Sequence, residues 1–253
     1  DIVRVAVLDE ADAIAIREVT KKISLPLVAD IHFSPKLAVM AIESGADKVR
    51  INPGNIGGEE KVRMVVEAAG NAGIPIRAGA NGGSLPKGLL DSFMAKGMSH
   101  SEALAEALCH AAMEQVKLLE SYDFHAIKVS MKASNVPVTV AACRKFAQRS
   151  DCPLHLGITE AGTEYNAICK SAAGIGALLL DGIGDTIRVS LTDDPVEEVY
   201  AAKDILKAAG LRKEGVNIIS CPTCGRTRID LIGLVNKVDE ALKDCEKPIT
   251  VAV

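Results

Sequence analysis

The sequence predicts an α/β fold, a closed barrel of parallel strands and surrounding helices of the (β/α)8 TIM type. Three observations support this prediction. Short runs rich in β-branched residues alternate with longer stretches that carry the 3.6-residue apolar period of helices. Glycine or a capping residue stands at several helix boundaries, and cations recur within the strand-like runs. A (β/α)8 barrel is the commonest closed form of such alternation, and a doubly wound open sheet is the structural alternative.

Seven β-branched runs are the predicted strands of the barrel. They are Ile2–Val7, Leu27–Ile31, Lys48–Ile51, Ile74–Ala78, Ala126–Ser130, Leu154–Ile158 and Thr186–Leu191. Because a helical stretch follows each of them, consecutive strands should run parallel.

The helical stretches between and after these strands have recognisable ends. They are Glu10–Lys22, Pro35–Ser44, Glu59–Ala72, Ser101–Tyr122, Val138–Gln148, Thr163–Asp181 and Pro195–Ala209. Glycine stands where helix C-caps are expected, at Gly45, Gly73 and Gly210. Ser34 is an N-cap candidate before a proline, and Ser99 has the spacing of a capping box with Glu102.

The two ends of the chain predict further elements. Because Asp1 opens directly onto an apolar strand, we expect the first strand of the barrel to lie in a segment that precedes this chain. The last part contains a predicted strand, a helix and a strand that stops in mid-element, at Val216–Ser220, Asp230–Leu242 and Lys247–Val253. We therefore expect a barrel domain at residues 1–212 and an incomplete, small α+β domain at residues 213–253.

The composition restricts the class of protein. Of the 253 residues, 48% are hydrophobic and 25% charged, which suits a soluble chain with a sizeable core. The formal net charge of −4 and the absence of tryptophan argue against broad nucleic-acid binding, which needs a basic surface and stacking platforms. The chain shows no signal peptide, no apolar run near the roughly 18 residues of a membrane span, and an odd count of cysteines. These features predict a cytoplasmic protein.

Five predicted strands each carry a cation among apolar residues. These cations are Arg4, Arg50, Arg77, Lys128 and Arg188. A single such cation usually has a structural ion pair, but carboxylates at the same strand ends are few and burial of unpaired charge is costly. The carboxyl ends of barrel strands form one face, so the cations should converge with Asp30, His32, Asn81, His155, Thr159 and Glu160. We expect a multiply charged anion there, because arginine forks suit phosphate or diphosphate oxygens.

Two glycine-rich loops follow predicted strands. Residues 52–58 (Asn-Pro-Gly-Asn-Ile-Gly-Gly) and 81–84 (Asn-Gly-Gly-Ser) could hold phosphate with backbone amides at a helix N-terminus. Neither is a P-loop, because the Gly-Lys-Ser/Thr end is absent, and each could equally be an ordinary turn.

Cys221 and Cys224 lie three residues apart in a turn that follows a predicted strand. This spacing is used by zinc ribbons, iron-sulfur clusters and redox thiol pairs, and two unpaired thiols in a turn would also explain it. Three other cysteines, Cys109, Cys143 and Cys169, fall on apolar helix faces, where a buried, inert thiol is expected. The Cys221 turn is therefore the candidate for soft-metal or thiol chemistry.

Five ordered segments carry a resemblance that covers essentially the whole chain. They are residues 29–33, 50–57, 157–162, 188–195 and the Ser-Cys-Pro-Thr-Cys-Gly-Arg run at 220–226. Together they resemble the 4-hydroxy-3-methylbut-2-enyl diphosphate synthases of the methylerythritol phosphate route to isoprenoids. The resemblance implies an iron-sulfur oxidoreductase that reductively opens 2-C-methyl-D-erythritol 2,4-cyclodiphosphate. It also implies a 4Fe-4S cluster on a small C-terminal domain that faces a TIM barrel.

The resemblance further implies individual site residues. Contacts to the cyclic diphosphate are implied for Arg4, His32, Arg50, Asn52, Arg77, Asn81, Lys128, Thr159, Arg188 and Ser190. Cys221 and Cys224 are implied as two of three cysteine ligands of the cluster. Glu160 is the candidate acid or base or a contact to a substrate hydroxyl, and a structural partner for a barrel cation is the alternative role. The family takes its third cysteine and a ligating glutamate from a later motif that Cys245 does not match. We therefore expect this chain to bind the substrate without turning it over.

The resemblance implies partners as well, namely flavodoxin or ferredoxin as electron donor and a second subunit in a homodimer. Two alternatives remain. A dihydropteroate synthase-like barrel would explain the cations at the strand ends but leaves the cysteine turn unused. A zinc-binding interaction module would use the turn, although a zinc ribbon normally needs a second pair of ligands.

Overall fold

The computed structural model describes residues 1–52 and 56–253. Within these residues the chain forms two compact units, Asp1–Ala202 and Lys203–Val253. The domain boundary expected between residues 212 and 213 stays a prediction.

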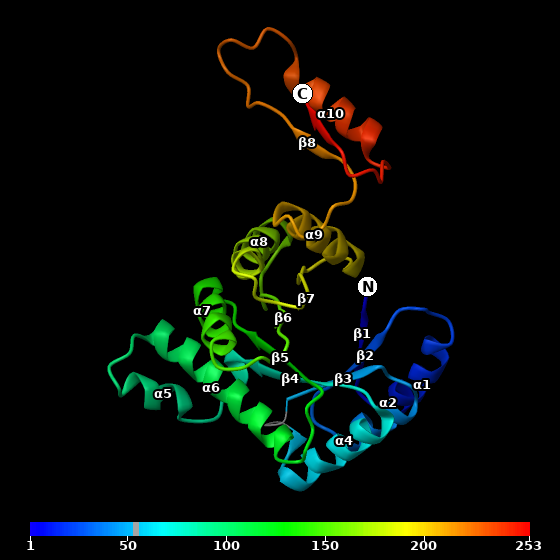
Figure 1. Cartoon of the computed structure of the whole chain (residues 1–253), viewed down its shortest axis with the longest axis vertical. Coiled ribbons are helices and arrows are strands. Elements are labelled where there is room, and N and C mark those ends of the chain that lie inside the picture. The colour runs from blue at the N-terminus through cyan, green and yellow to red at the C-terminus, as the bar shows by residue number, and fades with distance from the viewer. Residues whose placement is uncertain (53–55) are drawn as a thin grey trace. The chain divides into compact units, whose positions relative to one another are not determined.

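The first unit alternates strands and helices in the predicted order (Figure 1). Its strands are β1 (Val3–Val7), β2 (Leu27–Ile31), β3 (Lys48–Ile51), β4 (Ile76–Asn81), β5 (Ile127–Lys132), β6 (His155–Leu156) and β7 (Thr186–Ile187). Its helices are α1 (Glu10–Thr20), α2 (Pro35–Glu43), α4 (Glu59–Ala72), α5 (Leu89–Met94), α6 (His100–Glu120), α7 (Val136–Ala147) and α8 (Glu164–Leu180). Helix α9 (Pro195–Ala208) begins in this unit, and a 3-10 turn, η1 (Gly82–Ser84), follows β4. Helix α5 and η1 were not predicted.

The strands of this unit pair in sequence order and in parallel. Strands β1 to β5 form one sheet in the order β1-β2-β3-β4-β5, and β6 pairs with β7. A parallel bridge between Val129 and Leu154 connects β5 to the start of β6. Sequential parallel pairing with a helix after each strand is the arrangement of a TIM-type barrel.

The two faces of each strand differ in chemistry. Register pairs align Val49 with Ile76, and Ile76 with Ile127, and these apolar side chains are all buried. Because strand side chains alternate between faces, the residues one position further along lie on the opposite face. These are charged and aligned in one row: Asp30, Arg50, Arg77 and Lys128. A barrel interior is usually filled by branched apolar residues, so a row of charges marks this interior as functional.

Helix capping explains where several helices begin and end. The Ser34 hydroxyl accepts a hydrogen bond from the Leu37 amide at the start of α2, and Ser99 and Glu102 form the predicted capping box of α6. Gly73 ends α4 with a φ of 67°, a left-handed conformation that favours glycine. Helix α6, with 21 residues, is the longest helix described. Among the described residues no helix is both long and apolar enough to cross a membrane.

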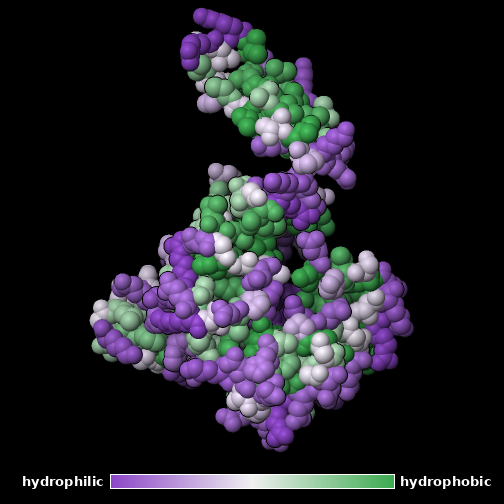
Figure 2. All heavy atoms as spheres, in the orientation of Figure 1, coloured by the Kyte–Doolittle hydropathy of each residue, from purple (hydrophilic) through white to green (hydrophobic). Residues whose placement is uncertain are grey.

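The second unit is a small α+β element. Strands β8 (Asn217–Ile219) and β9 (Thr250–Ala252) pair in parallel, and α10 (Leu231–Leu242) connects them. No side chain between residues 206 and 253 is buried. Large apolar side chains are exposed here instead, at Leu211, Ile219, Ile229, Ile232, Leu234 and Ile249. Figure 2 shows hydrophobic residues gathered on the surface of this unit.

Candidate functional site

A polar cavity of about 320 Å³ opens at the carboxyl ends of the barrel strands. Its lining comes from β1 to β5 and from the loops that follow the strands. The lining residues are Arg4, Asp30, His32, Phe33, Arg50, Asn52, Arg77, Asn81, Ser84, Ser130, Lys132, Thr159, Arg188 and Ser190. The carboxyl ends of parallel barrel strands are the usual position of an active site, so this cavity is the candidate site of the first unit.

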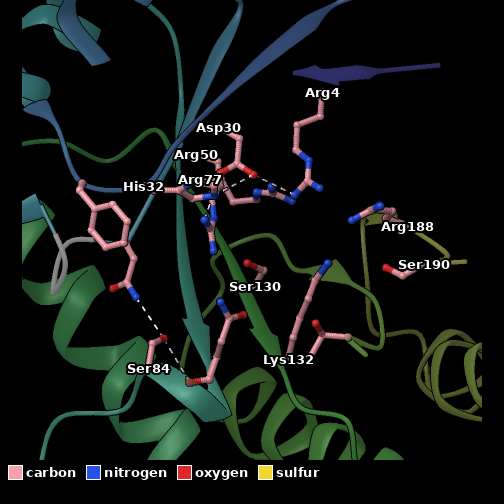
Figure 3. A pocket seen from close by; sticks show the side chains of 14 residues that line it. Arg4, Asp30, His32, Arg50, Arg77, Ser84, Ser130, Lys132, Arg188 and Ser190 are labelled. Atoms are coloured by element: carbon pink, nitrogen blue, oxygen red, sulfur yellow. Dashed lines mark hydrogen bonds and ion pairs between the residues drawn. The ribbon is translucent and has the colours of Figure 1, made fainter. Parts of the chain in front are cut away.

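Asp30 joins two of the cavity's arginines. Its Oδ1 lies 3.0 Å from Nη1 of Arg50, and its Oδ2 lies 3.2 Å from Nη1 of Arg4. The same Oδ2 is 3.9 Å from Nε2 of His32. Figure 3 shows the carboxylate between the two guanidinium groups. Asp30 and Arg50 are both largely shielded from solvent, and the shared carboxylate fixes the two arginine side chains relative to each other.

Two further cations lie deep in the barrel. Arg77 is buried, and its Nε has no hydrogen-bond partner among the residues that the structure describes. Burial, together with the charges of Arg4 and Arg50, lowers the pKa of the Arg77 guanidinium to about 10, so the group stays protonated at neutral pH. Lys132 is also buried, and burial followed by the charge of Arg77 holds the pKa of its ammonium well below the usual value. An anionic ligand would stabilise the charged form of both groups.

The backbone at Gly157, just after β6, approaches Lys132 closely. A Cβ added at Gly157 would lie 2.7 Å from the Arg188 carbonyl oxygen and 2.9 Å from Nζ of Lys132. Gly157 therefore has to be glycine for Lys132 to reach this part of the cavity. The end of β5, which carries Lys132, and the segment after β7, which carries Arg188, meet at this point.

Arg188 is held by a carboxylate from outside the cavity. Its Nε donates to Oε2 of Glu198 at 3.1 Å, and its Nη2 donates to Oε1 at 3.0 Å. Glu198 lies in the first turn of α9. The cavity lining itself therefore contains five cations and one carboxylate among the described residues.

Uncharged hydrogen-bonding groups line the other side of the cavity. The Asn52 side-chain amide donates to Oγ of Ser84 at 3.3 Å, and Gln115 of α6 donates to the Asn52 oxygen at 3.2 Å. The Ser84 hydroxyl in turn donates to the Asn81 carbonyl at 3.3 Å. The 3-10 turn at residues 82–84 thus places Ser84 and Asn81 beside the end of β3.

The structure brings together most of the residues predicted for the site. Of the ten predicted substrate contacts, all but Lys128 line the cavity. Lys128 lies lower in the barrel, where its Nζ donates to Oγ1 of Thr186 at 3.1 Å. His155 also bonds to this hydroxyl, through Nδ1 at 2.9 Å, and it does not line the cavity. Burial, followed by the charges of Lys132 and Arg77, holds the pKa of His155 well below its usual value, so its ring is neutral.

The glycine-rich loops and Glu160 contribute less to the described cavity than the strand cations do. Residues 53–55 of the first glycine-rich loop lie outside the described residues, so its predicted phosphate contacts are not described. The second loop, at residues 81–84, contributes Asn81 and Ser84 to the cavity. Glu160 is exposed and is not part of the lining, and its φ of 53° is rare for a residue other than glycine. Its role as acid or base stays a prediction.

Lys132, Ser130 and Phe33 line the cavity although they were not predicted as site residues, and Ser84 was predicted only as part of its loop. Lys132 was missed because the predicted strand stopped at Ser130, whereas β5 continues to Lys132. The alternation Lys128-Val129-Ser130-Met131-Lys132 carries the missing signal, since it puts the two lysines and the serine on one face.

The cysteine turn lies in the second unit, after β8. Cys221 and Cys224 are both exposed and free. Hydrogen bonds from the backbone of Arg226 and the hydroxyl of Thr227 lower the pKa of the Cys224 thiol. Among the described residues, no group of three or more histidines, cysteines or carboxylates could hold a metal ion. One expectation was wrong, because Cys169 is exposed rather than buried.

Comparison with protein families gives two matches. The sequence model of the GcpE TIM-barrel domain matches residues 1–203, and that of the GcpE protein C-terminal domain matches residues 217–253. The predicted α/β barrel of the TIM type is thereby confirmed.

Curated relatives match over the whole chain. The protein named 4-hydroxy-3-methylbut-2-en-1-yl diphosphate synthase (flavodoxin) is 54% identical in Clostridium perfringens, where this chain covers 70% of the relative's length. The relative of the same name in Caldanaerobacter subterraneus is 54% identical with 69% covered, and that in Bacillus subtilis is 53% identical with 65% covered.

Solved structures with a similar fold include dihydropteroate synthase from Yersinia pestis. The superposition has a TM-score of 0.54 at 11% sequence identity and covers 83% of this chain and 82% of the other. A second Yersinia pestis structure, with a pterine-sulfa conjugate, has a TM-score of 0.53 at 9% identity. At such low identity the likeness shows the barrel fold alone.

Proposed function

The chain belongs to the 4-hydroxy-3-methylbut-2-en-1-yl diphosphate synthase family, and we propose that its barrel binds 2-C-methyl-D-erythritol 2,4-cyclodiphosphate for reductive opening to 4-hydroxy-3-methylbut-2-enyl diphosphate. One observation carries this proposal. The lining of the described cavity holds five cations and a single carboxylate, Asp30, which is already shared between two of them. A ligand with two phosphate groups supplies the missing negative charge.

The chemistry of the cations suits this ligand. Arg4, Arg50, Arg77 and Arg188 present planar guanidinium groups, which bind phosphate oxygens through two parallel hydrogen bonds. Asp30 uses part of the donor set of Arg4 and Arg50 and leaves their other N–H groups for a ligand. The cavity volume of about 320 Å³ lies at the small end of the range for ligand sites, as expected for a compact cyclic diphosphate.

The uncharged groups give the ligand an orientation. Asn52, Asn81, Thr159 and Ser190 offer amide and hydroxyl groups to its hydroxyls and to phosphate oxygens not held by arginine. His32 lines the cavity with its Nε2 3.9 Å from Oδ2 of Asp30, where the imidazole can exchange a proton with a hydroxyl of the ligand. The cations stabilise negative charge that develops on the diphosphate end as the ring opens.

The reduction needs electrons that the barrel side chains do not supply. We propose that Cys221 and Cys224 hold a 4Fe-4S cluster as two of its ligands, and their exposed thiols fit two ligand positions. The described residues do not complete a ligand set. When bound, the cluster would pass electrons one at a time. Flavodoxin, which appears in the relatives' names, or ferredoxin would be the electron donor, and the active form would be a homodimer.

Calorimetric titration tests substrate binding without requiring turnover. Wild type should bind the cyclic diphosphate, and Arg50→Ala and Arg188→Ala should each weaken binding roughly tenfold or more, because each removes a charge-assisted fork to phosphate. A dihydropterin diphosphate serves as the competing ligand for the alternative barrel function. If wild type binds the pterin ester and ignores the cyclic diphosphate, the proposed function is wrong.

A further inference from the structure

Glu198 holds one edge of Arg188 in a planar fork. The two side chains form parallel hydrogen bonds, from Nε to Oε2 at 3.1 Å and from Nη2 to Oε1 at 3.0 Å. The Glu198 side chain is only 14% exposed, against 38% for Arg188. Such a bidentate pair fixes the plane of the guanidinium group as well as its position.

The fork leaves the other edge of the guanidinium group free for a ligand. A guanidinium group has five N–H donors, and the fork uses the Nε–H and one N–H on Nη2. The remaining donors are both N–H groups on Nη1 and one on Nη2. Arg188 lines the cavity whereas Glu198 does not, so the carboxylate lies on the side of Arg188 away from the ligand.

Glu198 also fastens the loop that carries Arg188. Its Oε1 accepts a hydrogen bond from the Leu191 amide at 3.1 Å. Leu191 packs against the buried cluster that includes Ile158 and Ala161. One carboxylate therefore connects the first turn of α9 to the segment that contains both Arg188 and Ser190, which are cavity residues.

Electrostatic repulsion acts against this arrangement. Arg188 points toward a cavity that already contains Arg4, Arg50 and Arg77. Burial and the charges of Arg188 and Arg50 lower the pKa of Arg4, whereas Asp30 and Glu198 act in the opposite direction. Without an opposing carboxylate, a half-exposed arginine would turn from this cluster toward solvent.

We propose that Glu198 is a positioning residue that holds Arg188 in the orientation that binds one phosphate group of the ligand. The inference rests on the function proposed above, since it assigns a role toward the same ligand. A positioning role for Glu198 predicts the opposite change in anion affinity from that expected of its charge alone. Neutralising a carboxylate near an anion site should strengthen anion binding if only charge matters, but should weaken it if the carboxylate positions the arginine.

The experiment is a double-mutant cycle measured by calorimetry on the full chain. Glu198→Gln, Arg188→Ala and the double variant are titrated with the cyclic diphosphate and, as a second probe, with inorganic pyrophosphate. Glu197→Gln is the matched control, because Glu197 is the exposed neighbour in the same helix turn and its loss changes the net charge equally. Thermal unfolding of each protein reports on folding, and Glu198→Asp replaces Glu198→Gln if the latter does not fold.

We expect Glu198→Gln to weaken binding about tenfold, and Glu197→Gln to leave it unchanged. In the Arg188→Ala background the Glu198 substitution should have no further effect, because the two residues act as one unit. Unchanged or tighter binding by Glu198→Gln, or an equal loss in the Arg188→Ala background, overturns the inference. Binding of pyrophosphate but not of the cyclic diphosphate refutes the proposed substrate while the cycle still tests Glu198. Binding of neither probe overturns both.

Discussion

Oδ1 of Asp30 lies 3.0 Å from Nη1 of Arg50, although Asp30 is the one carboxylate in the described lining of a cavity suited to anions. A carboxylate in such a place would repel a phosphate, so its contribution has to come from the cations it holds. Arg50 is nearly as buried as Asp30, with 13% and 8% of the side chains exposed. Breaking a buried pair leaves an uncompensated charge, which is more costly than a lost surface bridge.

Asp30→Asn should therefore reduce both stability and ligand binding. We expect the free energy of unfolding to fall by about 3 kcal/mol, because Arg50 and Arg4 lose their shared partner. Denaturant unfolding in the absence of ligand measures this loss. Asp239→Asn, at an exposed position on α10, is the control for the change in net charge. An Asp30→Asn protein as stable as wild type would show that the two arginines do not need the carboxylate.

The same substitution can distinguish the role of Lys132 from that of Lys128. Both lie on one face of β5, but Lys132 lines the cavity and Lys128 bonds to Thr186 below it. Methionine keeps the length of the side chain and removes its charge. We expect Lys132→Met to weaken binding of the cyclic diphosphate at least tenfold and Lys128→Met to change it less than threefold. Calorimetry measures both effects, and a larger effect at Lys128 would support the ligand contact that the sequence resemblance implies for it.

Binding should be coupled to proton uptake at pH values between the lowered pKa of Lys132 in the empty protein and its higher pKa in the complex. In the empty protein the pKa of Lys132 lies well below 10.5, and an anionic ligand favours the charged ammonium and raises this pKa. Affinity should therefore fall as the pH rises between the two pKa values. Titrations at a series of pH values below 10.5, in buffers with different ionisation enthalpies, give the number of protons taken up at each pH. Lys132→Met should abolish this uptake, and uptake unchanged in that variant would assign the proton to another group.

The same lysine affects the stability of the empty protein. A group whose pKa is lowered by folding binds fewer protons in the folded than in the unfolded state between the two pKa values. Stability should therefore rise with pH through this window up to about 10.5, and decrease as the pH falls through it. Comparing the pH dependence of unfolding in wild type and Lys132→Met isolates this contribution, which the variant should lack.

The sequence predicted the barrel and most of the cavity because both depend on short-range patterns. Period-2 alternation places Arg50 and Arg77 on the face opposite Val49 and Ile76, and parallel pairing then aligns them across strands. Strand length was harder to predict. Strand β5 extends beyond Ser130 because its backbone pairs with β4 as far as Asn81, a contact that no local pattern shows.

Glu198 illustrates a second limit of prediction from local sequence patterns. In the sequence it is one of two adjacent acidic residues in the first turn of a helix, where acids are common because they complement the helix dipole. Only the path of the loop after β7 decides that Glu198 meets Arg188 and that Glu197 does not. Tertiary contacts of this kind follow from packing, here of Leu191 against the buried cluster that includes Ile158, rather than from residue spacing.

Gly79 should be important for the position of Arg50. A Cβ added at Gly79 would lie 3.2 Å from Nε of Arg50 and 3.2 Å from Oγ of Ser130, closer than ordinary contacts. Gly79→Ala should displace the guanidinium group and weaken ligand binding about tenfold, with an unfolding penalty of about 1 kcal/mol. Gly70→Ala, on α4 and outside the cavity lining, is the control, since no described atom lies within 4 Å of its added Cβ. Equal binding by the two variants would mean that Arg50 adapts or does not contact the ligand.

We expect iron binding by the chain to depend on the cysteine turn. Reconstitution of the chain with iron and sulfide under anaerobic conditions should load iron only if both Cys221 and Cys224 are present, because thiolates bind iron in such clusters. Cys221→Ser and Cys224→Ser should each lower the bound iron and sulfide to the background level, whereas Cys169→Ser, at another exposed thiol, should not. Metal analysis and the visible absorption of the cluster measure the result. Stoichiometric zinc without sulfide would favour a zinc module, and equal loading of all three variants would show that the turn does not bind the metal.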